Sequence, residues 1–207
     1  TIMTMEQGRA TTDSPARIRT RNAILKAAAR VLSQNQAAAL GEVADSAGVA
    51  RSTLHRYFPE RNDLVDALRR YADEEIAAAT ARARLEDGPA VDALVRLCHE
   101  YFDLWDTITW VYLDSTRECD DTTAFDAQLD PCVTALIERG HREGSIDPAV
   151  PNAWLQQLLW TLLYTAWEYI RQGASKHEAL TLALDSLRRL TMPQSRTTTQ
   201  AGVLQER

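Results

Sequence analysis

The sequence predicts an all-α protein of about nine helices, and three observations support this prediction. Apolar residues recur with a period near 3.6 along nearly the whole chain, whereas no segment shows the alternation typical of a half-buried strand. Ala and Leu are abundant, while only 8 Gly and 7 Pro interrupt the 207 residues, which favours helix. The clusters of Pro, Gly and Asp fall between the periodic segments and therefore mark helix ends.

The first four helices are expected in the N-terminal third of the chain. Pro15 opens a first helix over 15–34, and two short helices follow at about 40–47 and 51–57. Pro59 ends this group because its ring cannot continue a helix. A longer fourth helix is expected from about 61 to 84.

The Asp-Gly-Pro sequence at 87–89 is the clearest break in the chain and separates the fourth helix from the rest. Helices are expected at 89–106 and at about 107–118. An acidic loop and a short helical turn at 124–129 should follow.

The last three helices carry recognisable end signals. Asp130 is a good N-cap before Pro131, so a helix is expected from there to about Glu143, where Gly144 fits a C-terminal cap. A long, very apolar helix is expected over 151–172. The final helix, 176–191, follows a capping box that begins at Ser175.

Four segments follow from this pattern. They are a flexible arm, a small trihelical unit, a larger helical body and a polar, disordered tail, at residues 1–14, 15–60, 61–192 and 193–207.

Composition and cysteine usage narrow the class of protein. No apolar run approaches the roughly 18–20 residues that span a bilayer, and the N-terminal residues do not resemble a signal peptide. The three cysteines, Cys98, Cys119 and Cys132, form no metal-ligand spacing, which indicates free thiols in a reducing compartment. We therefore expect a cytoplasmic protein with no membrane partner, no bound metal and no cofactor.

The net charge of −6 is unevenly distributed. Residues 15–61 hold eight Lys/Arg and three Asp/Glu, a net charge of +5, whereas residues 62–207 carry −10. A basic segment on an acidic body indicates a local surface for a polyanion, although chance clustering produces charge differences of this size as well.

Residues 42–58, EVADSAGVARSTLHRYF, meet the requirements of a helix-turn-helix unit together. Ala44 is small where two helices must cross closely, and Gly48, four residues later, tolerates the positive φ of the turn. Apolar residues that lock the second helix onto the first stand at the required places, namely Val43, Ala47, Val49, Leu54 and Tyr57. A helical hairpin with a solvated polar face is the less specific interpretation.

The second of these helices presents side chains that can read or hold DNA. A helix of this size fits the major groove, where Arg pairs with guanine and Ser, Thr and His contact base edges or phosphates. The expected DNA-binding residues are Arg51, Ser52, Thr53, His55, Arg56, Tyr57 and, at the start of the fourth helix, Arg61.

The stretch LGEVADSAGVARSTLHRYFPERNDL, within residues 18–68, resembles the DNA-binding signature of the TetR family of bacterial repressors. Arg61 matches the Lys with which the family contacts phosphate. The sequence departs from the family at Ala38 and Ala39, where Thr often holds a phosphate, at Ser52, where Gly is common, and at His55, where Tyr is common. These departures weaken one phosphate contact and prevent the operator sequence from being carried over.

The resemblance implies a ligand-responsive repressor that is not an enzyme. It implies a small-molecule effector pocket in the middle helices and a homodimer formed through the last two helices. A twofold dimer would place its recognition helices about 34–36 Å apart and would bind a near-palindromic double-stranded operator.

Aromatic residues in the body, interspersed with acids, predict the chemistry of the effector. Ring faces and carboxylates suit a lipophilic cation, as in a multidrug-binding regulator, and family habit then suggests control of an efflux pump. The expected ligand-binding residues are Trp105, Asp106, Trp110, Asp114, Trp160, Tyr164, Trp167 and Glu168. For any single acid, exposure to solvent is the simpler interpretation, and most of the aromatics must belong to the core.

Two other functions compete with this one. An enzyme would need a nucleophile–base set, a metal cluster or a phosphate loop, and the four His are scattered without such a pattern. The alternative within the same fold is a DNA-binding regulator without a small-molecule ligand, controlled by a partner or constitutive.

Overall fold

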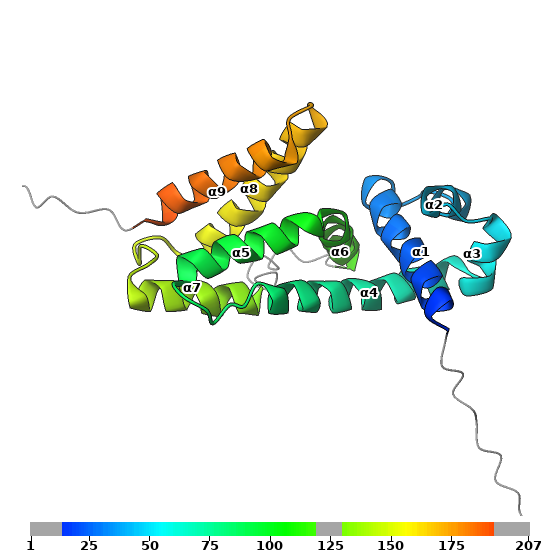
Figure 1. Ribbon diagram of the computed structural model, residues 1–207, viewed down its shortest axis with the longest axis horizontal. Helices are drawn as coiled ribbons and strands as arrows, with labels where there is room; N and C mark the ends of the chain where they lie inside the picture. The colour runs from blue at the N-terminus through cyan, green and yellow to red at the C-terminus, as the bar shows by residue number, and fades with distance from the viewer. Residues whose placement is uncertain (1–13, 119–129, 193–207) are drawn as a thin grey trace, which may run out of the picture. The chain divides into compact units, whose positions relative to one another are not determined.

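The computed structural model describes residues 14–118 and 130–192, the side chains of 112–118 excepted. These residues form nine α-helices and no strand, which confirms the predicted all-α class (Figure 1). The helices are α1 (Pro15–Gln34), α2 (Leu40–Ala47), α3 (Arg51–Tyr57), α4 (Arg61–Arg82), α5 (Ala90–Asp103), α6 (Trp105–Glu118), α7 (Pro131–Glu143), α8 (Asn152–Arg171) and α9 (Lys176–Thr191).

The helix ends agree with the signals in the sequence. Ser175 Oγ accepts a hydrogen bond from the Glu178 N–H at 3.1 Å, and Asp130 Oδ1 accepts one from the Cys132 N–H at 2.8 Å. The expected helix at 89–106 is shorter, because Leu104 adopts φ −101° and ψ 16° and separates α5 from α6. The expected turn at 124–129 lies outside the described residues.

The chain divides into two compact units. The first extends to Ile76 and includes α6 from Asp106 onward, while the second holds Ala77–Trp105 and the helices that follow α6. The continuous helix α4 contributes to both, since its residues up to Ile76 belong to the first unit and its last turns to the second.

The core of the first unit is built from the apolar faces of α1 to α4 together with one residue of α6. Ile24 and Leu25 of α1, Leu54 of α3 and Leu64 of α4 are all fully or almost fully buried. Trp110 of α6 packs in the same core. Helix α6 thus stabilises α1 to α4, although α5 separates it from them in the sequence.

The second unit is built around α5, α7, α8 and α9, of which α8 and α9 lie side by side as an antiparallel pair (Figure 1). Gly140 of α7 permits a close approach, because a Cβ at this position would lie 2.5 Å from Ile146 Cδ1. None of the helices in the described ranges is both long and apolar enough to cross a membrane.

Candidate functional site

The turn between α2 and α3 has the geometry that the sequence predicts. Gly48 lies in the left-handed region, with φ 67° and ψ 31°, which an L side chain adopts only with strain. The Val49 N–H donates to the Ala44 carbonyl at 3.0 Å and closes the end of α2. Ala44 itself is completely buried, as expected where two helices cross closely.

Helix α3 packs against the core of the first unit on one side and is exposed on the other. Leu54 and, just beyond the helix, Phe58 are buried in the core of the first unit. Ser52 and Arg56 are one turn apart on the exposed side, with His55 beside them. The structure therefore presents these three predicted DNA-binding side chains together, and Thr53 lies at the edge of the same face, half-buried.

Arg51 has a different environment from Arg56, although both belong to α3. The Arg51 guanidinium lies against α2, where a Cβ added to Gly41 would be 2.9 Å from its Cζ. Gly41 therefore leaves room for this arginine. This contact could not be predicted, since a glycine early in a helix does not indicate which side chain lies against it.

A cavity of about 410 Å³ lies between the start of α1 and the end of α3 and is rich in hydrogen-bond donors. The Arg17 guanidinium lies 5.5 Å from the centre of the Tyr57 ring and that of Arg56 lies 6.0 Å from it. The residues that line the cavity are Ser14, Ala16, Arg17, Thr20, Arg56 and Tyr57. The two guanidinium groups and the hydroxyls of Ser14 and Tyr57 suit a phosphate, whereas the Thr20 hydroxyl already donates to the Ala16 carbonyl at 3.0 Å. The contact between Arg17 and Tyr57 could not be predicted from the sequence, because the two residues are far apart in the chain.

Arg61 holds the start of α4 to the loop between α1 and α2. Its guanidinium donates to the Ala38 carbonyl at 2.6 Å and also to the carbonyl of Gln36 in that loop. Ala39, where the family often has a hydroxyl, keeps half of a capping box, because the Glu42 carboxylate accepts from its N–H at 2.9 Å. Arg61, which is predicted to contact phosphate, therefore also stabilises the packing of α4 against this loop.

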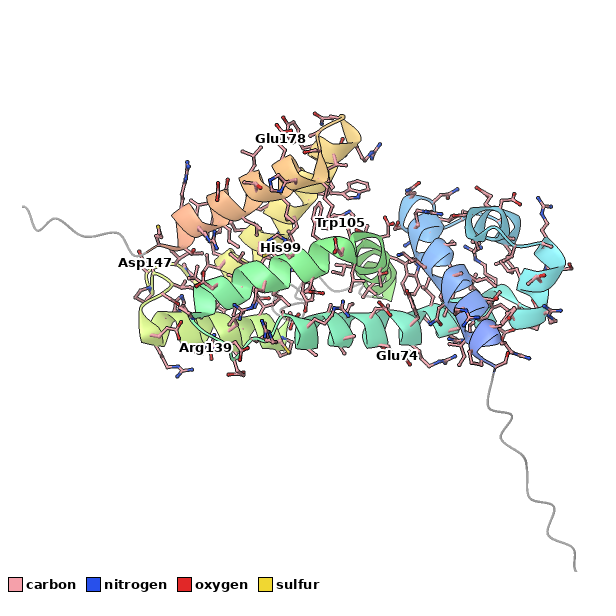
Figure 2. All side chains as sticks on the ribbon, in the orientation of Figure 1. Glu74, His99, Trp105, Arg139, Asp147 and Glu178 are labelled. Atoms are coloured by element: carbon pink, nitrogen blue, oxygen red, sulfur yellow. The ribbon has the colours of Figure 1, made fainter. Side chains whose placement is uncertain are left out.

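An aromatic cluster in the second unit joins Trp105, the first residue of α6, to α8. The Trp105 ring, labelled in Figure 2, lies 6.2 Å from Tyr164 and 5.9 Å from Trp167, centre to centre. Arg171 Cζ lies 5.2 Å from the centre of the Trp167 ring, and Arg171 also pairs with Glu168 at 3.6 Å. A ring face of this cluster thus already accommodates a planar cation that a neighbouring carboxylate supports.

The remaining predicted effector residues lie in other surroundings. Trp160 stacks on Tyr101 with ring centres 5.7 Å apart. Trp110 is buried in the core of the first unit. Asp106 belongs to that unit too, where burial raises the pKa of its carboxyl while Arg30 and Lys26 partly oppose the shift. The side chain of Asp114 lies outside the described residues.

Among the side chains that the structure describes within 14–118 and 130–192, no three His, Cys, Asp or Glu residues are placed to hold a metal ion.

Comparison with known proteins places the chain in a family. Residues 24–68 match the model described as "Bacterial regulatory proteins, tetR family". The chain is 37% identical over 175 residues to the HTH-type transcriptional repressor LfrR of Mycolicibacterium smegmatis, covering 84% of this chain and 92% of the relative. It is 27% identical over 164 residues to the HTH-type transcriptional regulator NfxB of Pseudomonas aeruginosa, covering 77% of this chain and 88% of the relative.

The chain belongs to the TetR family.

Solved structures agree with this assignment. The crystal structure of the TetR-like transcriptional regulator LfrR from Mycobacterium smegmatis matches with a TM-score of 0.67 at 32% identity, covering 86% of this chain and 99% of that one. A structure of LfrR in complex with proflavine matches with a TM-score of 0.59, also at 32% identity, covering 85% and 99%. As a TetR-family member, the chain is a DNA-binding transcriptional regulator and not an enzyme.

The two bonds of Arg61 lead to a testable prediction for this TetR-family regulator. Arg61→Ala should lower the free energy of unfolding by roughly 1.5–3 kcal/mol, because it removes charge-assisted hydrogen bonds to two carbonyls. Urea denaturation followed by circular dichroism measures this loss. Arg61→Lys keeps the charge without the planar fork, so its free energy of unfolding should lie between those of the wild-type protein and Arg61→Ala. If Arg61→Ala leaves the free energy of unfolding unchanged and lowers the salt dependence of DNA binding, then Arg61 contacts phosphate and its two carbonyl bonds do not stabilise the fold.

Proposed function

We propose that the chain is a ligand-responsive repressor of the cytoplasm. It binds a near-palindromic operator as a homodimer and is released by a lipophilic, planar or multi-ring cation. The controlled gene then encodes an exporter of such compounds. The observation that carries this proposal is the aromatic cluster of Trp105, Tyr164 and Trp167 in a chain similar to a repressor crystallised with proflavine.

The DNA part of the proposal is supported by charge and by exposure. The net charge of +5 over residues 15–61 contrasts with −10 over residues 62–207. Ser52, His55 and Arg56 form the exposed side of α3, and the cavity beside it holds Arg17. This arrangement supports base contacts from α3 and phosphate contacts from the start of α1.

The dimer is supported by apolar side chains that the single chain leaves exposed on the paired helices α8 and α9. Trp154 is 64% exposed, Leu182 55% and Leu190 51%. Large apolar side chains in a contiguous region mark an interaction surface more often than isolated ones do. A twofold pairing through α8 and α9 would cover them and would present two copies of α3 to successive major grooves.

The effector class is supported by the chemistry of the cluster. Proflavine, which LfrR binds in its crystal structure, is a flat aromatic cation. In this chain Arg171, a planar cation, already lies over Trp167 beside Glu168. A free cation with larger aromatic surface can replace that guanidinium, since Arg171 is largely exposed and loses little on returning to water.

Repression and release are then linked equilibria. A cation that binds better to the form with badly spaced recognition helices lowers operator affinity. DNA must weaken cation binding by the same factor. The ligand can shift the equilibrium only by its difference in affinity for the two forms.

The test uses tetraphenylphosphonium, a lipophilic cation that does not intercalate into DNA, with neutral triphenylphosphine oxide as its uncharged control. A duplex selected from a random pool by the protein serves as the operator, and fluorescence anisotropy reports binding. We expect the cation to lower operator affinity and to quench Trp fluorescence, and the neutral compound to do neither.

A variant separates the site from general effects of the cation. Glu168→Gln keeps the size of the side chain and removes its charge, so it should weaken tetraphenylphosphonium binding while free-protein affinity for operator stays unchanged. If the protein binds its selected duplex and no cation changes that affinity, the result would favour a regulator that is constitutive or controlled by a partner.

A further inference from the structure

Tyr101 of α5 lies at the centre of a buried polar network in the second unit. The side chain is only 2% exposed, and its hydroxyl donates to Asp130 Oδ2 at 2.9 Å. The Thr80 hydroxyl lies 3.0 Å from the Tyr101 hydroxyl oxygen and, since Tyr101 gives its proton to Asp130, Thr80 acts as the donor to Tyr101. Burial raises the pKa of Tyr101 well above its usual value, so the hydroxyl remains a donor at physiological pH.

The network continues from Asp130 into α7 and α8. Asp130 caps α7 through the Cys132 N–H, and its own N–H donates to Gln156 Oε1 at 3.0 Å. The buried Gln156 amide donates in turn to Thr134 Oγ1 at 2.8 Å and to Asn152 Oδ1 at 3.3 Å. Because every one of these groups has a partner, the network specifies one arrangement of α5, α7 and α8 and resists partial adjustment.

The ring of Tyr101 contacts the aromatic side of α8. It stacks on Trp160 with ring centres 5.7 Å apart and planes inclined by 7°. Tyr164 lies one helical turn further along α8 and contacts Trp105 of the proposed effector cluster. A ligand that displaces Trp160 therefore acts directly on the ring whose hydroxyl organises the network, and one that displaces Tyr164 acts on it through Trp160.

The hydroxyl of Tyr101 also reaches α4 through Thr80. Thr80 lies four residues beyond Ile76, the last residue of α4 that belongs to the first unit. Arg82 of the same helix pairs with Glu100 of α5 at 2.7 Å, so this end of α4 is held to α5. The other end begins at Arg61, beside the helix-turn-helix (Figure 1). A helix is stiff over this length, so a displacement at Thr80 is carried along its axis.

We propose that Tyr101 is a positioning residue that couples effector occupancy to α4, with its ring sensing Trp160 and its hydroxyl holding Thr80 and Asp130. This inference rests on the proposed cation-responsive function. Hydrogen bonds from one hydroxyl to two fixed partners are directional, so rotation of the ring exchanges one set of contacts for another instead of deforming them gradually. The element with two positions is α4, and Tyr101 determines which of them the effector favours.

The test measures the coupling between tetraphenylphosphonium and operator, defined as the ratio of operator affinities without and with saturating cation. Tyr101→Phe keeps the stacked ring and removes only the hydroxyl. If wild-type coupling lies in the common range of about 5–150-fold, the variant should retain less than about a third of it. Its affinities for cation alone and operator alone should each change by less than about threefold, which a general loss of structure would not allow.

Two further variants sharpen the result. Thr80→Val removes the donor on α4 and should also reduce coupling. The double variant should be no worse than Tyr101→Phe, which already breaks the bond to Thr80 together with the bond to Asp130. Thr80→Val also keeps the inference testable if Tyr101→Phe does not fold. Tyr71→Phe is the matched control, because it deletes a hydroxyl from α4 within the first unit, outside this network, and should leave coupling intact.

The outcomes separate this inference from the proposed function. Wild-type coupling that survives in both Tyr101→Phe and Thr80→Val overturns the role of Tyr101 and leaves the cation-responsive repressor standing. If no cation affects operator binding of the wild-type protein, the proposed function fails and the role of Tyr101 falls with it.

Discussion

Arg56→Ala should reduce specific operator affinity by about 1–3 kcal/mol per half-site, and by roughly 2–6 kcal/mol for a dimer that contacts two half-sites. Arg56 lies on the exposed side of α3, one turn from Ser52 and opposite the buried Leu54. A guanidinium in that place can pair with guanine O6 and N7. The measurement is anisotropy with the selected duplex and with single-base variants of it, at one salt concentration.

Specificity distinguishes the base contact from a simple loss of charge. The Arg56→Ala variant should bind duplexes altered at one position of each half-site as well as it binds the selected sequence, whereas the wild-type protein should discriminate among them. Arg70→Ala is the matched control, since it removes an exposed arginine from α4 and should change operator affinity little. If Arg56→Ala weakens all sequences equally and lowers the salt slope, then Arg56 contacts phosphate beside Arg17.

Local signals explain why most helices could be predicted from the sequence. Gly48 was expected to adopt positive φ because only glycine does so without strain, and it does. Asp130 and Ser175 were expected to cap helices because their oxygens reach amides two or three residues away, and both bonds are present. Each of these features is decided within one turn of chain, so no knowledge of the fold is needed.

Partners distant in the chain could not be predicted in the same way. Periodicity marks the buried face of a helix but not the element that covers it. Arg61 was expected to face phosphate, and the bonds to Ala38 and Gln36, more than twenty residues away, carry no signal in a single sequence. The bond between Tyr101 and Asp130 spans 29 residues and was not predicted, for the same reason.

The predicted effector residues show this limit most clearly. Aromatic composition predicted a cluster, and the structure brings Trp105, Tyr164 and Trp167 together. The same composition could not separate Trp110 from them, although the structure packs that ring in the core of the other unit. A tryptophan on the apolar side of a helix has the same sequence pattern whether a protein core or a ligand covers it.

Trp110→Ala should therefore destabilise the protein by about 3–5 kcal/mol, the cost of a large cavity in a packed core. Trp110 is only 3% exposed and lies among Leu64, Leu68 and their neighbours in the unit that holds α3. Domains of this size are stable by only about 5–15 kcal/mol, so the loss is a large part of the total. Operator binding should disappear at temperatures where the wild-type protein still binds, as thermal denaturation and anisotropy together would reveal.

Trp110→Phe decides between a core role and a ligand role for this side chain. Phenylalanine fills most of the space, so we expect a smaller loss of stability than alanine causes, with unchanged affinity for tetraphenylphosphonium measured well below the melting temperature. A residue that lined the effector site would give the opposite result: nearly unchanged unfolding and a cation affinity lowered by about tenfold or more, as expected when an aromatic contact to a desolvated cation is lost. That second result would place Trp110 at the effector site and make it a direct contact between the ligand and the core of the DNA-binding unit.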